Sequence, residues 1–181
     1  MRKPACFLFS LMLIASMFFT SCKKTINEVF FTKNFEDKTF IVDSTVNSGV
    51  GVKFFGSQVI DTDLRESLAS AGFSINNLKS AEISEISLVA VDPNQDLNYF
   101  KSLEVRLNIQ GAQEVIFASA TLPDQTTDKR IDFIPGDVQL QEFFKDDEVA
   151  FAFYGTTDQP LTAPIELRFS MKFKFRAALG N

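Results

Sequence analysis

The sequence predicts a mainly β protein built as an antiparallel sandwich, and two alternating segments predict it most directly. Over residues 165–176, apolar residues at odd positions alternate with polar residues at even positions. The same alternation runs through residues 103–110. Because successive side chains of a strand point to opposite faces, each segment is typical of a strand with one dry and one wet face. Such strands belong to antiparallel sheets, since parallel sheets are usually covered on both faces.

Other apolar segments between turn signals predict the remaining strands. A strand rich in β-branched and aromatic residues is expected in each of six segments: 39–46, 50–55, 81–91, 114–120, 130–134 and 148–154. Within the last of these, residues 149–153 are apolar on both faces, which indicates a central strand. The turn signals include Asn47-Ser48-Gly49 and Pro135-Gly136.

Two short helices are predicted between the strands. Asp63 with Glu66 is a capping-box-like start, and Gly72 is placed to end the first helix. In the second, Asp137 is the expected cap, and residues 140–144 supply an apolar face. Many short strands with two minor helices favour a β-sandwich of immunoglobulin-like or related topology, whose strand order the sequence leaves open.

The first 22 residues predict a cleaved signal helix and a lipid-attachment site. Two basic residues precede an apolar stretch over residues 5–19, which is shorter than the roughly 20 residues of a membrane-spanning helix. Phe19 stands where ordinary signal cleavage after Ser21 requires a small residue. The segment resembles a bacterial lipoprotein signal, which implies that residues 1–21 are removed and that Cys22 carries acyl chains. A cleaved, soluble periplasmic form is the alternative.

The resemblance also implies an address. Lys23 and Lys24 follow the cysteine, where Asp would resemble an inner-membrane retention signal, so an outer-membrane location is expected. The Phe-rich leader and Ser-Cys ending are similar to those of small uncharacterised Bacteroidota lipoproteins, whose surface-export signal carries acidic residues after the cysteine. Residues 23–27 contain none, which favours the periplasmic leaflet over the cell surface.

Length and composition bound the rest of the chain. We expect residues 22–28 to form the lipidated N-terminus and a short tether, and residues 29–181 to form one domain of common size. After the leader, 16 basic and 23 acidic side chains remain, and this acidic balance argues against nucleic acid as a partner. The chain has no His, and Cys22 is the only cysteine beyond the leader. Disulfides, imidazole chemistry and Cys/His metal sites are therefore excluded from the mature form.

The 21 phenylalanines allow two interpretations. Aromatic side chains bury large areas, so Phe can fill the core in place of Leu and Ile. Alternatively, Phe residues can line a cavity for a hydrophobic ligand.

A possible metal site lies at Asp92, Asn94 and Asp96, which place oxygen ligands at alternate positions as calcium loops do. Leu97 and Leu103 stand where such a loop has Gly and a bidentate Glu. A simple Asx–Pro turn is therefore the competing interpretation, and no cofactor is expected.

A possible binding face lies on the last predicted strand. Its wet side carries Arg168, Lys172, Lys174 and Arg176. These cations could meet anionic lipid head groups or an acidic partner. Alternatively, they protect the sheet against edge-to-edge aggregation.

Together these observations favour a non-catalytic protein. Acid–base catalysis needs two carboxylates in different environments, and no catalytic residue is identified in the sequence. We expect a membrane-anchored module that binds an envelope protein or a polysaccharide. The alternative is a periplasmic carrier of a hydrophobic ligand in a Phe-lined cavity.

Overall fold

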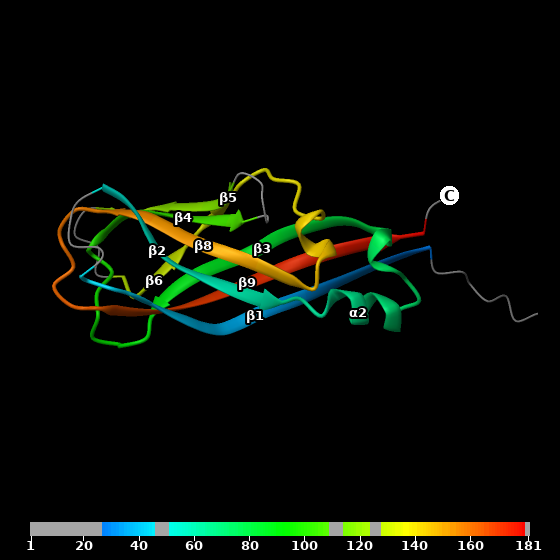
Figure 1. Cartoon of the computed structure of the whole chain (residues 1–181), viewed down its shortest axis with the longest axis horizontal. Helices are drawn as coiled ribbons and strands as arrows, with labels where there is room; N and C mark the ends of the chain where they lie inside the picture. The colour runs from blue at the N-terminus through cyan, green and yellow to red at the C-terminus, as the bar shows by residue number, and fades with distance from the viewer. Residues whose placement is uncertain (1–26, 46–50, 109–113, 124–127, 180–181) are drawn as a thin grey trace, which may run out of the picture.

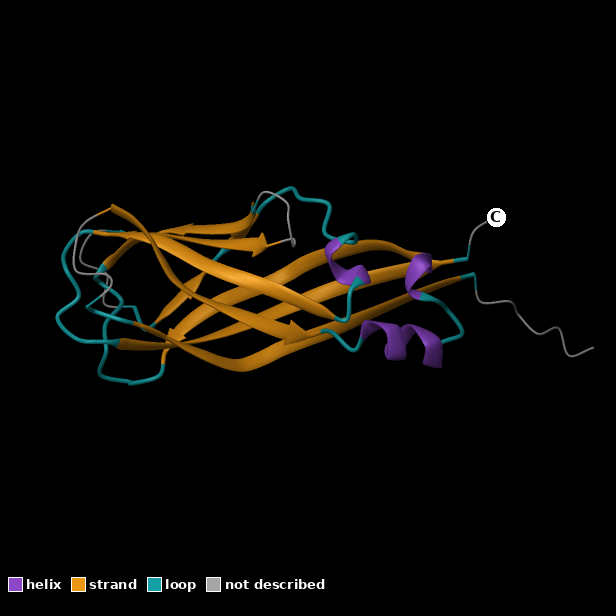
Figure 2. Ribbon diagram, in the orientation of Figure 1, coloured by secondary structure: helices purple, strands orange, loops and turns teal. Residues whose placement is uncertain are grey.

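The computed structural model describes residues 27–45, 51–108, 114–123 and 128–179, and it consists mainly of two antiparallel β-sheets (Figures 1 and 2). The four-stranded sheet has the order β1 (Glu28–Val42), β9 (Ile165–Ala178), β3 (Leu78–Ala90) and β6 (Arg130–Asp132). The five-stranded sheet has the order β2 (Gly51–Asp61), β8 (Glu148–Thr157), β4 (Phe100–Asn108), β5 (Val115–Thr121) and β7 (Ile134–Pro135). The leader and Cys22 lie outside the described residues.

The strand predictions are largely confirmed. β9 alternates buried and more exposed residues from Ile165 to Arg176, as its sequence pattern predicts. β8 lies between β2 and β4, so the prediction of a central strand at residues 149–153 is correct. β1 begins earlier than the sequence predicted. Lys33 occupies an inward position and interrupts the apolar alternation, so the pattern did not reveal the first part of the strand. Its Nζ donates a hydrogen bond of 2.6 Å to the carbonyl oxygen of Thr62.

The first predicted helix is present as α2 (Leu64–Ser70), but Asp63 does not cap it as expected. Asp63 has a left-handed backbone with φ of 46°, and its side chain makes no capping hydrogen bond. Its backbone carbonyl instead accepts bonds from the N–H and hydroxyl of Ser67. Gly72 has φ of 83°, which confirms its predicted place after the helix, because this conformation favours glycine.

The second predicted helix is wrong. Asp137 caps nothing, and within residues 136–147 only a 3₁₀ turn, η2 (Phe143–Lys145), is helical. This segment leads from β7 back to β8, and Leu140 and Phe144 are buried without a continuous helix. A 3₁₀ turn that the sequence did not predict, η1 (Ile75–Asn77), precedes β3 and has a capping box between Ser74 and Asn77.

Phenylalanine rings join the two sheets. Phe40 of β1 stacks on Phe153 of β8 with ring centroids 4.5 Å apart, and Phe153 also contacts Phe169 of β9 at 5.1 Å. Further along, Phe144 of η2 packs on Phe173 at 4.8 Å. All five rings are buried, so these phenylalanines form a packed core between the sheets.

The N-terminal end of β1 and the C-terminal end of β9 lie side by side at one end of the molecule (Figure 1). β1 pairs with β9 along nearly its whole length, and the N–H of Leu179 donates to the carbonyl oxygen of Asn27 at 3.0 Å. None of the helices in the described ranges has the length and hydropathy needed to span a bilayer.

Candidate functional site

The outer face of the five-stranded sheet gathers exposed apolar side chains. Of the nine large apolar side chains that are exposed in the described ranges, five lie on this face. They come from β2, β5 and β7: Val52, Phe54, Val59, Ile116 and Ile134. In a sheet with one solvent-exposed face, large apolar side chains normally point toward the core. Five of them on an outer face therefore mark this face as a candidate binding surface.

Cross-strand register distributes these side chains around the middle of the face, from β2 at one edge to β7 at the other. One row across the sheet runs Phe54, Tyr154, Glu104, Ser119 and Ile134. The next row runs Ser57, Ala152, Arg106 and Ile116. The register of β2 shifts between residues 54 and 56, so residues on both sides of this irregularity point outward.

A half-buried charge network lies in the middle of the face. The Nε and Nη2 of Arg106 donate to Glu104 Oε2 at 3.1 and 2.7 Å, and its Nη1 donates to Glu114 Oε2 at 3.4 Å. The guanidinium carbon lies 4.1 Å from the centroid of the Tyr154 ring, a cation–π contact. Tyr154 in turn donates its hydroxyl to Glu114 Oε1 at 3.0 Å, and Phe54 meets its ring edge-on at 5.3 Å.

The network changes two titrations. The hydrogen bond to Glu104 is the main cause that raises the pKa of Arg106 above its usual value. Burial is the main cause that raises the pKa of Tyr154, and its hydrogen bond to Glu114 adds to the effect. At neutral pH, therefore, the arginine is charged, the tyrosine is neutral, and the cation is shared between two carboxylates.

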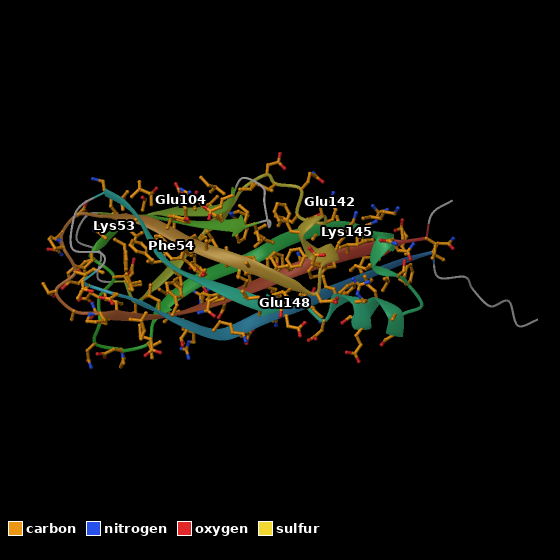
Figure 3. The ribbon with its side chains drawn as sticks, viewed as in Figure 1. Lys53, Phe54, Glu104, Glu142, Lys145 and Glu148 are labelled. Atoms are coloured by element: carbon orange, nitrogen blue, oxygen red, sulfur yellow. The ribbon has the colours of Figure 1, made fainter. Side chains whose placement is uncertain are left out.

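A shallow hollow of about 350 Å³ lies beside this network. Ala150 and Ala152 of β8 form part of its lining, and Phe54 stands at its side on the edge strand β2 (Figure 3). The remaining lining residues are Ser57, Glu114, Phe151 and Tyr154. The small side chains of Ala150 and Ala152, between the larger Phe54 and Tyr154, form the floor of this hollow.

The outer face of the four-stranded sheet has a different character, because acids accompany most of the predicted cations. Arg176 Nη2 lies 2.6 Å from Glu28 Oε1, and Lys172 Nζ lies 3.3 Å from Glu85 Oε1. Lys174 stands opposite Glu82 in the register of β3 and β9.

The hydrogen bond from Arg176 lowers the pKa of the Glu28 carboxyl below its usual value. Arg168 is exposed on the same face and also has an interaction partner. β9 lies between β1 and β3, so its cations cannot protect a sheet edge. Their role in binding an anionic surface stays a prediction, weakened by these paired charges.

The three candidate calcium ligands lie in a turn between β3 and β4. Asp92 Oδ1 accepts the backbone N–H of Asn94 at 2.8 Å, which is an Asx turn, and Asp96 pairs with Lys129. Across the described ranges, no group of three or more Asp, Glu, His or Cys side chains gathers in a way that could hold a metal ion. The structure therefore gives two of the three ligands other partners.

Sequence reasoning missed the apolar face, although it named several of its strands. The alternation of residues 103–110 placed Glu104 and Arg106 on a wet face, and Tyr154 is one of only two tyrosines in the chain. What joins them is the order β2-β8-β4-β5, which no local pattern encodes.

Comparisons with known proteins add little. No protein-family model matches the chain, and no curated protein matches it. One matching solved structure is a chain of Desmodium yellow mottle tymovirus, with 8% identity, a TM-score of 0.26, and coverage of 85% of this chain and 89% of that one.

Proposed function

We propose that the protein is a non-catalytic adaptor: a β-sandwich lipoprotein anchored through Cys22 in the periplasmic leaflet of the outer membrane, which holds an envelope protein on the outer face of its five-stranded sheet. The observation that carries this proposal is the asymmetry between the two outer faces. One carries mostly paired charges, with Phe30 and Ile41 exposed among them, while the other collects five exposed apolar side chains around a paired charge network.

Physical chemistry favours a protein as the partner on this face. Exposed apolar side chains gathered on one face mark protein–protein contacts, and Phe, Tyr and Arg are enriched in such contacts. Five strands spaced about 4.8 Å apart and two to eleven residues long present on the order of 600 Å². This approaches the roughly 800 Å² that each partner buries in a standard interface. A polysaccharide, which has few apolar groups, would leave most of these side chains uncovered.

The charge network is compatible with this role because its cation is already paired. Arg106 is bonded to Glu104 and Glu114, so a partner that covers the network does not leave the arginine without a counter-charge. The network keeps one net negative charge, which favours a partner with a hydrogen-bond donor or a basic side chain at this point.

No observation favours the carrier alternative in the same way. The core phenylalanines contact one another at ordinary ring distances, and the hollow beside Phe54 opens on the surface of one sheet. Among the described residues, the packed rings fill the space between the sheets in which a bound lipid would need an apolar chamber.

Site-specific photo-crosslinking in the native envelope tests the proposal. A photoreactive residue replaces Val59 on the apolar face, and a matched control replaces Ile41 on the outer face of the other sheet. The two positions are comparably exposed, at 56% and 62%, and both lie on edge strands. We expect a discrete protein adduct from position 59 and none from position 41. Equal adducts at both positions, or a polysaccharide adduct at 59, would contradict an apolar protein-binding face.

The anchor has its own test. Intact mass of the protein from its native membrane should show loss of residues 1–21 and added acyl mass on Cys22, and Cys22→Ala should release the protein from the membrane fraction. A free thiol at Cys22 in the mature protein would refute the lipid anchor.

A further inference from the structure

β3 has an edge that is only partly paired. The strand pairs with β9 from Leu78 to Ala90, but on its other side β6 covers only residues 87–89. Its register with β9 shifts between residues 78 and 80 and again between 83 and 85. Between these two irregularities lies a short regular stretch, residues 80–83, whose outer edge pairs with no other strand of the described ranges. The N–H and C=O groups of such an edge are a template for another strand.

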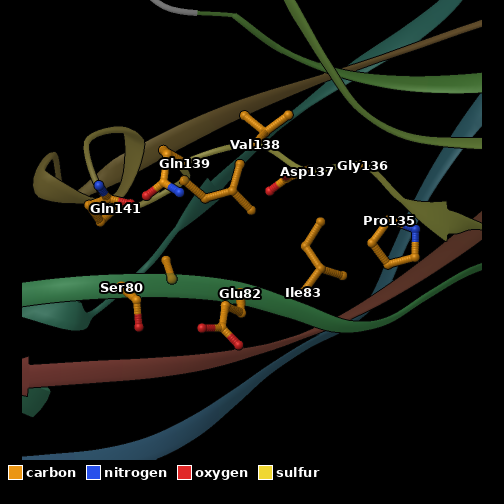
Figure 4. Close-up of a pocket in the computed structure, with 11 residues that line it drawn as sticks. Ser80, Glu82, Ile83, Pro135, Gly136, Asp137, Val138, Gln139 and Gln141 are labelled. Atoms are coloured by element: carbon orange, nitrogen blue, oxygen red, sulfur yellow. The ribbon is translucent and has the colours of Figure 1, made fainter.

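The segment that faces this edge, residues 135–141, does not pair with it (Figure 4). Its backbone bonds go elsewhere: the N–H of Gly136 donates to Phe117 at 2.7 Å, and that of Val138 donates to Gly136 at 3.1 Å. In the described part of the chain, no backbone hydrogen bond joins residues 135–141 to residues 80–83. Between the two lies a hollow of about 330 Å³, lined by residues 80–83 and 135–141.

The side chains around this hollow have two characters. Ile83 projects from β3 toward the facing segment, and Val138 lies across the gap from it, so the inner side is apolar (Figure 4). Glu82 points to the opposite side of β3, toward solvent, and Asp137 is exposed on the facing segment. No ion pair or hydrogen bond joins Glu82 or Asp137 to another described residue, although Lys174 stands opposite Glu82 in register.

We propose that residues 80–83 of β3 are a strand-addition site for an extended peptide that alternates apolar and basic residues. Backbone bonds from the free edge hold such a peptide, and alternate side chains select it. A residue that enters beside Ile83 faces the apolar gap, while the next residue lies beside Glu82, where a cross-strand neighbour of opposite charge is favoured. Asp137 adds a second carboxylate at the mouth of the same hollow. The site is separate from the apolar face of the five-stranded sheet.

A synthetic peptide with the sequence Lys-Val-Lys-Val-Lys-Val is the probe, and Glu-Val-Glu-Val-Glu-Val is its charge-reversed counterpart. The protein used lacks the leader and carries Cys22→Ser. Titration calorimetry measures affinity, and hydrogen exchange measures protection of the amides of residues 80–83. We expect the basic peptide to bind and to slow exchange at these amides, and the acidic peptide not to bind.

Paired variants locate the site. In Glu82→Lys/Asp137→Lys, affinity for the basic peptide should fall by about tenfold and the acidic peptide should begin to bind, because cross-strand charge pairs are reversed. Glu85→Lys, another exposed carboxylate on β3 outside the hollow, is the control and should leave affinity within about twofold. All three carboxylates are exposed, and thermal unfolding checks that each variant stays folded.

Three outcomes would overturn the proposal. One is no binding of the basic peptide by the wild-type protein. Another is binding without protection of residues 80–83. The third is protection of these amides by self-association without peptide, seen as concentration dependence in sedimentation, which would assign the edge to a second copy of the chain.

Discussion

Phe153→Ala tests whether the phenylalanines form a packed core, because this ring joins the two sheets. Phe153 is only 1% exposed and contacts Phe40 and Phe169 across the interface. Truncating a buried Phe to Ala costs about 3–5 kcal/mol through lost burial and a residual cavity. Each lost ring pair adds about 0.5–1.5 kcal/mol. We therefore expect a loss near the top of this range, about 5 kcal/mol of unfolding free energy.

Urea denaturation of the protein without its leader measures this loss, with Phe30→Ala as the control. Phe30 is 68% exposed, and its truncation should cost no more than about 0.5 kcal/mol. For a domain of this size, 5 kcal/mol corresponds to a fall in Tm of roughly 10–20 °C. A cost below about 1 kcal/mol for Phe153→Ala would refute the packed core, because a ring that borders an open chamber has few contacts to lose.

Three further predictions follow from the same contacts. Gly155→Ala should lower the unfolding free energy measured in urea by about 1–3 kcal/mol, because a Cβ at this position would lie 2.4 Å from the carbonyl oxygen of Ser102 on the paired strand β4. Unchanged stability would show that β8 and β4 can separate at this point. When the Tyr154 ring is followed by NMR, its hydroxyl should titrate above the ordinary tyrosine pKa, because burial and the Glu114 carboxylate both raise that pKa. Glu114→Gln should therefore lower the midpoint. The stability linked to the neutral hydroxyl is present below the pKa of Tyr154 in the unfolded chain and is lost as pH rises through the pKa in the folded protein. Tm should stay nearly flat between about pH 6 and 8, since the chain has no His, and a steep slope in this interval would contradict the prediction. At acid pH, Tm should fall as Glu28 becomes protonated, because Arg176 lowers the pKa of this carboxyl in the folded state.

Local patterns predicted the strands well where burial is periodic. Residues 165–176 alternate without interruption, and β9 follows the pattern because it has one core face and one wet face. The start of β1 was missed because Lys33 stands on the inner side, where a bond to the Thr62 carbonyl satisfies it. That bond joins residues far apart in the chain, so no local signal announces it.

The predicted caps at Asp63 and Asp137 failed, and the cation face of β9 was described incompletely, for related reasons. Asp137 resembled a cap, but the segment after it leads from β7 to β8 of the same sheet and buries Leu140 and Phe144 without a continuous helix, so tertiary packing overrides the local helix signal. The four cations of β9 looked like a positive face because their acidic neighbours, among them Glu28 and Glu85, lie on other strands. Charge compensation across a sheet depends on strand order, which the sequence alone did not supply.

The pairing of the first and last strands has a mechanical consequence for a tethered protein. A load that enters at the N-terminal end of β1 and acts along the strand must shear the β1–β9 hydrogen bonds together. The hydrogen bond between Asn27 and Leu179 also opposes separation of β1 from β9 at this end. The proposed anchor at Cys22 would therefore load the domain in the direction in which its first strand is held by many hydrogen bonds.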